Sequence, residues 1–288
     1  MERIKVLGNN LAEAATLSGG SWFASLPLAN AQTEDFSEVA RSSDATVAST
    51  VIEVDLGYSQ SVQAIALIST NLTTAYSYRI RYWNDSGFSD LDEDSGWTTP
   101  IGAAEMYTLE WDSPYFWNHI LPWDDTERGP SLFHVRSALR IARWLTIELD
   151  DESNPDEYVD IGFQYIGPIL HPAINYLPDE NSLSFIDKSR RIESLSGAER
   201  VLRRTNNRVM RFAFAQQAFT EDTLFSDWFE IMRRTGYDKL VGVIPDSDDD
   251  ERVLQRRAFF GRFQEMSGIT QAVAGYGTTG FEIKEAIR

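Results

Sequence analysis

The stretch VIEVDLGYSQSVQAIALISTN, residues 51–71, contains the first clear fold signal of the chain. Ile52, Val54 and Leu56 alternate with acidic side chains. Successive side chains of a strand point to opposite faces, so one face of this segment enters a core and the other meets solvent. Gly57 ends the run, and the stretch predicts two strands joined by a turn. A sheet of this kind has three possible roles, as a catalytic scaffold, as a sugar-binding module or as part of a larger assembly.

The same alternation returns later in the first half of the chain. YSYRIRYWND, residues 76–85, places its tyrosines on one face, and ARWLTIELDD (142–151) and EYVDIGFQYIGP (157–168) follow the same pattern. Between 85 and 130 the chain is rich in turn-forming and aromatic residues, which indicates long loops. Many strands, few helices and long loops predict a β-sandwich of jelly-roll type over residues 1–167.

Residues 168–288 have a different texture. SGAERVLRRTNNRVMRFAFAQQ predicts a long hairpin with its turn near the Asn-Asn pair at 206–207. After that turn, Met210, Phe212 and Phe214 alternate in the manner of an inward-facing strand.

The strongest helix signal of the chain covers residues 221–235. Thr220 can cap its start, Arg233 and Arg234 suit the negative end of the helix dipole, and Gly236 terminates it. KLVGVIPD, RRAFFGRFQEM and TTGFEIKEAIR then read as strands. The sequence therefore predicts a mostly β protein, in which a second β-sandwich with one flanking α-helix follows the jelly roll.

The formal charge of −18 is distributed unevenly. Residues 1–167 contain 26 Asp+Glu and 9 Lys+Arg, whereas residues 168–288 contain 18 and 17. The acidic first part repels nucleic acid, so no specific nucleic-acid binding is expected. In the second part, arginine pairs accompanied by equal numbers of acids indicate ion pairs within or between subunits.

Composition limits the class of protein further. No stretch reaches the roughly 20 apolar residues needed to span a bilayer, so no membrane insertion is expected. Glu13 interrupts the apolar run that a secretory signal needs, and export by the usual signal is not expected. The chain contains no cysteine, which excludes disulfides and Cys-ligated zinc and fits a reducing cytoplasm.

The order of these first-half strands resembles the discoidin or galactose-binding-like jelly roll. VIEVDLGYSQSVQAIALISTNLT looks like the IDLG-like strand of that family, and ARWLTIELDD with VDIGFQYIGP looks like its closing strand pair. The resemblance covers roughly residues 1–167. It implies a fold and leaves the function open, since such sandwiches serve as lectins, enzyme appendages and structural modules.

The second unit resembles the tail-tube-like fold of phage tail proteins, particularly distal tail and other minor tail proteins, which assemble into rings. The stretch LPLANAQTEDFSEVARSSDATVASTVIEVDLG also looks like the N-terminal region of phage structural proteins. Neither resemblance includes a catalytic signature. A jelly roll at the N-terminus departs from those distal tail proteins that carry a carbohydrate-binding module later in the chain.

Catalytic chemistry has little support in the residues. A Ser-His-Asp arrangement needs a positioned base, and the chain offers only His119, His134 and His171. None lies in a supporting motif, and no HExxH, Walker or dinucleotide-binding pattern is present. The sequence predicts no catalytic residue, no metal and no cofactor.

Carboxylates gather at three places, residues 124–125, 148–151 and 246–250. Glycosidases hold two carboxylates about 5–9 Å apart, which makes such clusters worth weighing. A solvated acidic surface explains all three. The run DSDDDERVLQRR begins like a calcium-binding EF-hand loop, yet it lacks Gly at its sixth position and has Arg257 in place of Glu at its twelfth.

Tryptophan is the remaining signal, because seven of the eight Trp residues lie in the first unit. Aromatic rings stack on sugar faces, and neighbouring polar side chains bind sugar hydroxyls. The predicted glycan-binding residues are Trp117, Trp123, Asn118, Asp124 and Asp125. The alternative is that these rings seal long loops onto the sandwich or are buried between subunits.

A subunit interface is predicted in the second unit. The loop PDSDDDE adds nothing to the core of a lone domain, but in a ring it can meet an arginine cluster of the neighbouring copy. The residues of this predicted interface are Asp246, Asp248, Asp249, Asp250, Arg233 and Arg234.

The sequence thus favours a non-enzymatic structural component of a tailed-phage virion, located at the tail tip or baseplate. Expected partners are further copies in a ring, the tail tube, hub and tape-measure proteins, and a host-surface glycan. The expected location is the virion tail, assembled in the host cytoplasm. The alternative is a carbohydrate-binding adhesin module, and a glycoside hydrolase is third.

Overall fold

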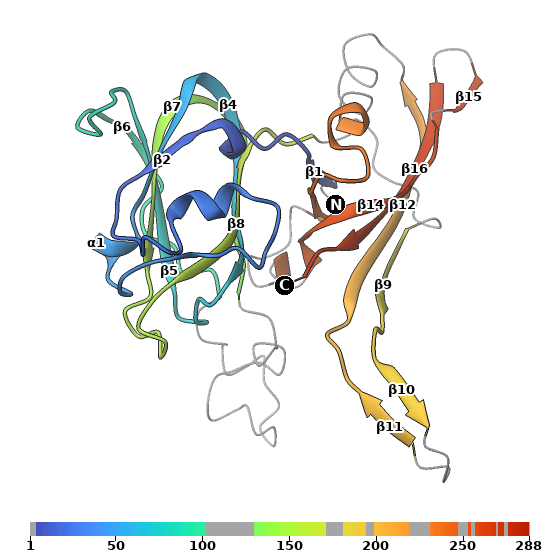
Figure 1. The fold of residues 1–288 in the computed structure, drawn as a ribbon. Coiled ribbons are helices and arrows are strands. Elements are labelled where there is room, and N and C mark those ends of the chain that lie inside the picture. Colours follow the sequence, from blue (N-terminus) through green and yellow to red (C-terminus); the bar gives the residue numbers. More distant parts are fainter. Residues whose placement is uncertain are drawn as a thin grey trace, which may run out of the picture. The chain divides into compact units, whose positions relative to one another are not determined.

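The computed structural model describes residues 4–101, 130–170, 181–193, 199–218, 231–246, 253–254, 257–268, 270–273 and 276–287. The chain divides into two compact units (Figure 1). The N-terminal unit is Asn10–Pro168 with the short piece Asp250–Gln255, and the C-terminal unit contains Met1–Asn9, Ile169–Asp249 and Arg256–Ile287.

The N-terminal unit is a β-sandwich. Its strands hydrogen-bond in the order β3-β8-β4-β7-β5-β6, and β2 pairs with β4. The strands are β2 (Thr16–Ser18), β3 (Ala40–Arg41), β4 (Ile52–Thr70), β5 (Ser77–Trp83), β6 (Leu91–Asp94), β7 (Leu132–Asp150) and β8 (Asp160–Gly167), and the short helices are η1 (Ala12–Ala14), η2 (Leu28–Gln32) and α1 (Val47–Thr50).

Two long strands, β4 and β7, build both layers of the sandwich. Their antiparallel pairing shifts register between Asp55 and Gln60, and again between Val62 and Ala64. Before the bend β4 lies beside β2 and one end of β7, and after it β4 lies between β8 and the other end of β7. The predicted hairpin within residues 51–71 is therefore wrong. Gly57, at φ +79°, turns the strand without ending it, since β7 follows β4 through the bend.

The core of this unit lies between the two layers. On β5, Tyr78, Ile80 and Tyr82 are buried, whereas the residues that alternate with them are partly exposed, as predicted. Ile147 on β7 and Ile161 on β8 belong to the same buried cluster. Period-two alternation therefore identified the core face of these strands correctly.

The C-terminal unit contains a sheet in the order β1-β13-β14-β16-β12-β9, with β15 paired to β16, and a separate ribbon β10-β11. Its strands are β1 (Lys5–Leu7), β9 (Ser182–Ile186), β10 (Arg190–Glu193), β11 (Glu199–Leu202), β12 (Asn207–Ala218), β13 (Val241–Ile244), β14 (Phe259–Met266), β15 (Thr270–Val273) and β16 (Tyr276–Glu285). The described strands of this unit thus form one seven-stranded sheet and a separate two-stranded ribbon.

The first strand of the chain belongs to this second unit. Lys5–Leu7 pairs antiparallel with β13, and Val6 forms a bridge with Leu170. The domain range 1–167 taken from the sequence placed these residues in the sandwich. Three residues are too short a segment for alternation to show which sheet they join, and that choice depends on a partner more than 200 positions later.

One face of this sheet carries the second core. Met210, Phe212 and Phe214 are buried there, as predicted, and Ile231 packs against the same cluster. The described part of the helix, residues 231–235, ends at Gly236, whose φ of +50° suits a residue just past a helix C-terminus. The rest of the predicted helix 221–235 lies outside the described residues.

The predicted turn at residues 206–207 is wrong. Asn207 starts β12 and pairs with Ile186 of β9. Residues 199–202, which were expected to be the opposite leg of a hairpin, instead pair with β10. Strands β9 and β10 therefore run along one side of a long ribbon, and β11 and the start of β12 run along the other.

The mostly β class of the chain is confirmed, with a jelly-roll-type sandwich at the N-terminus. Among the helices that the structure describes, none has the length and apolar character to cross a membrane.

Candidate functional site

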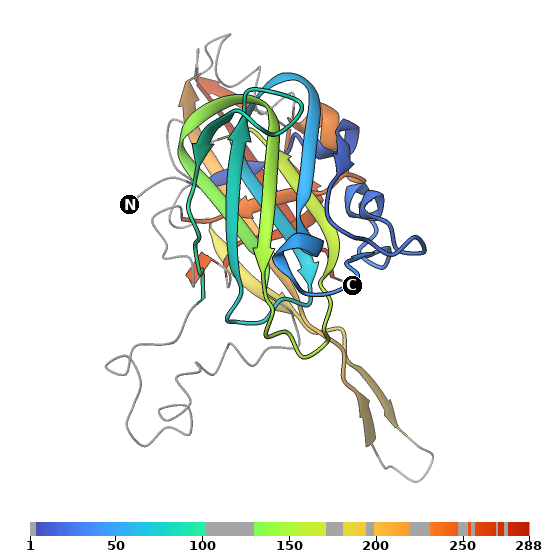
Figure 2. The same cartoon turned by 90° about the vertical axis from the view of Figure 1, so that its left-hand side faces the viewer.

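The outward side of the sandwich layer β2-β4-β7-β5-β6 carries aromatic rings among charged side chains. This layer faces the viewer in Figure 2. Cross-strand register sets Trp83 opposite Trp144 and Arg79 opposite Glu148. We call this surface the outer face and define it by Glu53, Asp55, Arg79, Arg81, Trp83, Trp144, Thr146 and Glu148, together with Arg143 and Trp97, which contact Asp55 and Arg79.

Trp83 and Trp144 lie side by side at the centre of one row of this face, on β5 and β7. The Nε1 of Trp83 donates a hydrogen bond to Oγ1 of Thr146 at 3.1 Å, which fixes the ring orientation. The edge of Phe88 meets Trp83 at a centroid distance of 6.3 Å. The Arg143 guanidinium lies 4.5 Å from the centroid of Trp144. Both indole rings are half-buried and held in place.

Trp97 adds a third ring at the edge of the face. It remains 46% exposed, and the guanidinium of Arg79 lies 5.1 Å from its ring centroid. A bridge between Tyr78 and Thr98 ties this segment to the edge of β5. The ring is therefore anchored on one side and open to solvent on the other.

Glu148 is the most buried charge of the outer face, at 4% exposure. Its Oε2 accepts a hydrogen bond from Nε of Arg79 at 2.9 Å, and its Oε1 is paired with Arg81. Burial, with the nearby positive charge of Arg79, lowers the pKa of Arg81. Paired charges of this kind hold both arginines flat against the sheet.

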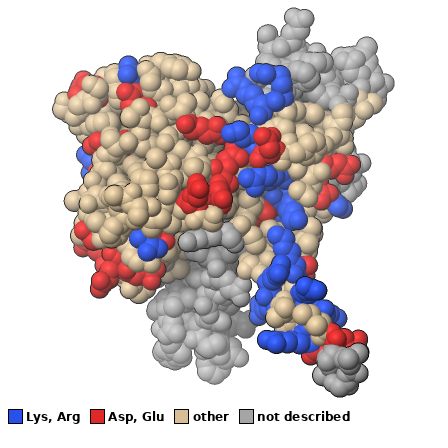
Figure 3. Space-filling view, in the orientation of Figure 1, with Lys and Arg blue, Asp and Glu red and all other residues tan. Residues whose placement is uncertain are grey.

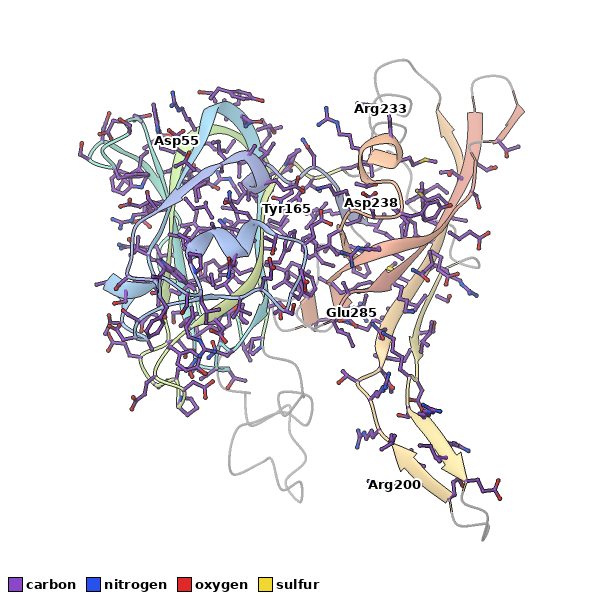
Figure 4. All side chains as sticks on the ribbon, in the orientation of Figure 1. Asp55, Tyr165, Arg200, Arg233, Asp238 and Glu285 are labelled. Carbon is purple, nitrogen blue, oxygen red and sulfur yellow. The ribbon has the colours of Figure 1, made fainter. Side chains whose placement is uncertain are left out.

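Asp55 and Arg143 form a second fixed pair. Nε and NH2 of Arg143 donate to the two carboxylate oxygens of Asp55 at 2.8 and 3.1 Å. These hydrogen bonds lower the pKa of Asp55 and raise the pKa of Arg143. Figure 4 labels Asp55 on the N-terminal unit. The pair sits beside Trp144, the residue opposite Asp55 on β7.

The arrangement suits binding more than bond breaking. Flat rings bordered by fixed donors and acceptors present stacking surfaces and hydrogen-bond partners to a polar ligand. Within the described part of the chain, no three His, Asp or Glu side chains gather in a way that would hold a metal ion.

Of the three histidines, only His134 lies within the described residues. Its Nδ1 is 3.3 Å from the hydroxyl of Tyr78, and the two rings meet edge-on. Burial, with a smaller effect of Arg136, lowers the pKa of His134 to about 4. His134 is thus a neutral, packed side chain at pH 7. His119 and His171 lie outside the described residues.

The carboxylate prediction at residues 148–151 needs correction. A solvated acidic surface was expected, but Asp151 is 2% exposed and Glu148 is similarly buried. Asp151 accepts hydrogen bonds from the backbone N–H of Thr73 at 2.9 Å and from its hydroxyl. Groups that are distant in sequence pair with these carboxylates or donate hydrogen bonds to them, which allows the carboxylates to be buried. Composition does not reveal such partners, and it therefore predicted exposed side chains.

The predicted glycan residues Trp117, Trp123, Asn118, Asp124 and Asp125 lie outside the described residues. Sequence reasoning missed Trp83 and Trp144 as a pair. The signal was present, since both occupy outward positions in alternating strands. Their juxtaposition needs the register between β5 and β7, which alternation does not provide.

The predicted interface is described only in part. Arg233 and Arg234 are exposed at the end of the helix, and NH1 of Arg234 donates to Oδ1 of Asn9 at 3.1 Å. Asp246 follows β13, whereas Asp248, Asp249 and Asp250 lie outside the described residues. The pairing of these groups between copies stays a prediction.

No protein-family model matches the chain, and no curated protein matches it.

Solved structures that are similar to the chain include carbohydrate-binding modules. Chitosan-binding module 1 from a chitosanase/glucanase of Paenibacillus sp. IK-5 has 18% identity and a TM-score of 0.38, over 56% of this chain and 99% of the module. The family 32 module of Clostridium perfringens NanJ, solved with galactose, has 14% identity and a TM-score of 0.35, over 57% and 98%. The family 89 glycoside hydrolase of Clostridium perfringens has 17% identity and a TM-score of 0.38, over 60% of this chain and 16% of the enzyme.

Proposed function

We propose that the N-terminal unit is a non-catalytic carbohydrate-binding module whose ligand lies on the outer face. The observation that carries this proposal is the side-by-side placement of Trp83 and Trp144 in a frame of fixed polar groups. The Cβ atoms of opposed residues on neighbouring strands lie about 5 Å apart, so the two indole side chains start from adjacent positions, and we expect them to form one stacking platform. The apolar faces of sugar rings stack on such a platform.

The polar frame supplies the second half of sugar recognition. Arg79, Arg81 and Arg143 donate hydrogen bonds, and Asp55 and Glu148 accept them. Sugar hydroxyls both donate and accept, so this mixture matches them. Because each charge already has a partner, a neutral ligand does not have to compensate a buried ion.

The charge of the unit narrows the class of glycan. Residues 10–168 contain 25 Asp+Glu and 7 Lys+Arg. Such a field attracts cationic ligands and repels anionic ones. We therefore expect neutral or amino-sugar polymers to bind, and polymers rich in uronic acid or sulfate to bind poorly.

The test compares Trp83→Ala and Trp144→Ala with the wild type in binding to immobilised chitosan, a neutral glucan and heparin. Each variant is expected to lose about tenfold in affinity for the first two polymers, which is the usual effect of removing a stacking ring. Tyr58→Ala is the matched control, because Tyr58 is an exposed aromatic residue at the β4–β7 bend, outside the outer face.

The same experiment includes Trp117→Ala and Trp123→Ala, which test the glycan site predicted from the sequence. Loss of binding in these two variants alone would move the site to the loops and overturn the outer-face assignment. A wild type that binds none of the polymers tested, and is silent on a glycan array, would end the carbohydrate proposal.

A second candidate function is a structural subunit of a tailed-phage virion at the tail tip or baseplate. One observation favours it, a long ribbon built from β9, β10 and β11 that carries exposed apolar residues. A ring, contacts with tail tube, hub and tape-measure proteins, and location in the virion tail belong to this candidate. Labelling purified particles with antibody against the protein tests it, and unlabelled particles would contradict it.

A further inference from the structure

The ribbon of the C-terminal unit has no core of its own among the described residues. We call it the arm and define it as residues 182–193 and 199–206. Every residue of β9, β10 and β11 is exposed. Figure 1 shows β10 and β11 extending beyond the seven-stranded sheet, whereas β9 lies along β12 at the edge of that sheet. The end formed by β10 and β11 is a two-stranded ribbon, and such a ribbon is marginally stable in water unless it packs against another element.

Large apolar side chains concentrate on the arm. Phe185 is 62% exposed and Val201 is 54% exposed. Six of the thirteen exposed large apolar residues in the described part of the chain lie here, namely Leu183, Phe185, Ile186, Ile192, Val201 and Leu202. Such a concentration is typical of a protein interface and costly for a surface that stays in water.

Leu183 and Phe185 of the arm continue the core face of the sheet, whereas the apolar residues of β10 and β11 lie on both faces of the ribbon. Leu183 of β9 pairs with Met210 of β12, and Met210 is buried beside Phe212. Paired residues share a face, so Leu183, and Phe185 two positions later, extend the buried row beyond the core. The part of this row on β12 is buried in the core, whereas the part on β9 is exposed. A partner protein can bury the exposed part.

The arm is also the basic segment of an acidic protein. It carries six Lys+Arg and three Asp+Glu, whereas the rest of the chain carries 20 and 41. Figure 3 shows Lys and Arg along the ribbon, and Figure 4 labels Arg200 on it. The surface that fits the arm is therefore both apolar and acidic.

The N-terminal unit has exposed apolar residues at the β4–β7 bend beside the four acids of residues 90–94, which keep an excess of two negative charges over Arg136 and Arg140. Tyr58, Leu139 and Ile141 are exposed there, at 68%, 57% and 67%. Arg136 and Arg140 of β7 bind carboxylates of β6, which brings that strand alongside the bend. We call this surface the bend patch and define it by Tyr58, Leu139, Ile141, Asp90, Asp92, Glu93 and Asp94.

We propose that the arm docks on the bend patch of a second copy of this chain. Apolar side chains of the arm then cover those of the patch, and arm arginines face the acidic strand β6. The arm and the patch are different surfaces, so the contact is heterologous and adds copies in a ring or an open chain. The inference deepens the second candidate function and does not depend on glycan binding.

A second copy fits better than nucleic acid as the occupant. Phosphate backbones are bound by cationic and polar groups, and the exposed Phe185, Ile192 and Val201 gain nothing from them. The chain as a whole carries −18, which repels a polyanion. The acidic partner that the arm needs is present in the same protein.

The first test measures self-association of the full chain by sedimentation at low and high salt. The variant Arg190→Glu, Arg191→Glu, Arg200→Glu is expected to weaken association about tenfold or more, and salt is expected to weaken the wild type. Phe185→Ser with Val201→Ser tests the apolar half of the contact. Arg233→Glu with Arg234→Glu is the competing variant, because it reverses arginine charge in the interface predicted from the sequence, outside the arm.

The outcomes are decisive in both directions. A wild type that stays monomeric at high protein concentration overturns the proposal. Unchanged association in the arm variants overturns it too, and loss in the Arg233 and Arg234 variant alone would favour the interface predicted from the sequence. Binding of labelled DNA or RNA that the triple variant abolishes, without self-association, would assign the arm to nucleic acid instead.

The second test locates the contact through Lys188, the one lysine of the arm. A carbodiimide joins its amine to a carboxylate in direct contact, and a mixture of ¹⁵N-labelled and unlabelled protein distinguishes links between copies. Heavy-to-light links from Lys188 to the peptide containing residues 90–94 are expected. Links within one copy only, or between copies to carboxylates elsewhere, overturn the bend patch as the docking surface.

Discussion

The two units each contain a long antiparallel ribbon, and the ribbons end differently. In the N-terminal unit β4 and β7, of 19 residues each, bend together and build both layers around one core. In the C-terminal unit the ribbon of β9, β10 and β11 extends with every residue exposed. When a ribbon folds over, the apolar side chains of its two halves pack against each other. The apolar side chains of a straight ribbon are buried only when another molecule contacts them.

The sequences of the two ribbons explain why one bends and the other stays straight. The β4–β7 ribbon has a flexible position at Gly57 and a register shift beside it, which permit the bend. The arm places arginines next to its apolar residues, as in Arg200 beside Val201, which keeps an extended strand soluble and discourages uncontrolled edge pairing. Three substitutions in the two ribbons test this difference.

The largest effect is expected for Ile147→Ala on β7. The side chain is fully buried between the layers, and removing buried methylene and methyl groups from a packed core costs about 2–5 kcal/mol of unfolding free energy. Seven of the eight Trp residues lie before Gly167, so urea unfolding followed by tryptophan fluorescence reports on this unit. Ile141→Ala, on the same strand but exposed, is the control. Equal losses in both variants would contradict the assignment of the core.

The second prediction uses His134, the half-buried histidine of β7. The pKa of His134 is lowered from 6.5 to about 4, so the unfolded chain takes up a proton more readily between these values. The unfolding free energy that depends on neutral His134 is fully present above pH 6.5. It decreases as the pH falls, and the loss reaches about 3 kcal/mol at pH 4. His134→Phe keeps a ring against Tyr78 and cannot titrate. The unfolding free energy of this variant should fall less steeply between pH 6.5 and 4, and parallel curves would refute the burial of His134.

The smallest effect is expected for Ile192→Ala on the arm. Ile192 is 42% exposed in the single chain, so its truncation should change the unfolding free energy of the monomer by less than about 0.5 kcal/mol. Unfolding at a protein concentration below that of self-association measures this. A loss comparable to that of Ile147→Ala would mean that the arm packs within its own chain.

Alternation predicted which residues enter each core more reliably than it predicted how strands connect. Tyr78, Tyr82, Phe212 and Phe214 are buried as expected. Side-chain direction along a strand is a local property with a period of two, so a single strand shows it. Gly236 at the helix end is a similarly local signal, because it depends on the backbone of one residue.

Connections and charges were harder to predict. Gly57 was interpreted as the end of a strand, yet β4 extends past it. The Asn-Asn pair at 206–207 was interpreted as a turn, yet Asn207 is the first residue of β12 and pairs with β9. Glu148 was expected on a solvated surface and is buried by two arginines of β5. In each case the deciding partner lies far away in sequence, where composition and local pattern carry no information.

Residue pattern and composition were enough to establish that the protein is mostly β, that its two parts differ in charge, and that Trp is concentrated in the first part. Strand pairing and packing were needed to show which Trp residues lie together, which strand Lys5–Leu7 joins, and which apolar residues stay exposed. The physical reason is that hydrophobicity and charge belong to single residues, whereas burial and juxtaposition depend on strand register and on contacts between distant segments.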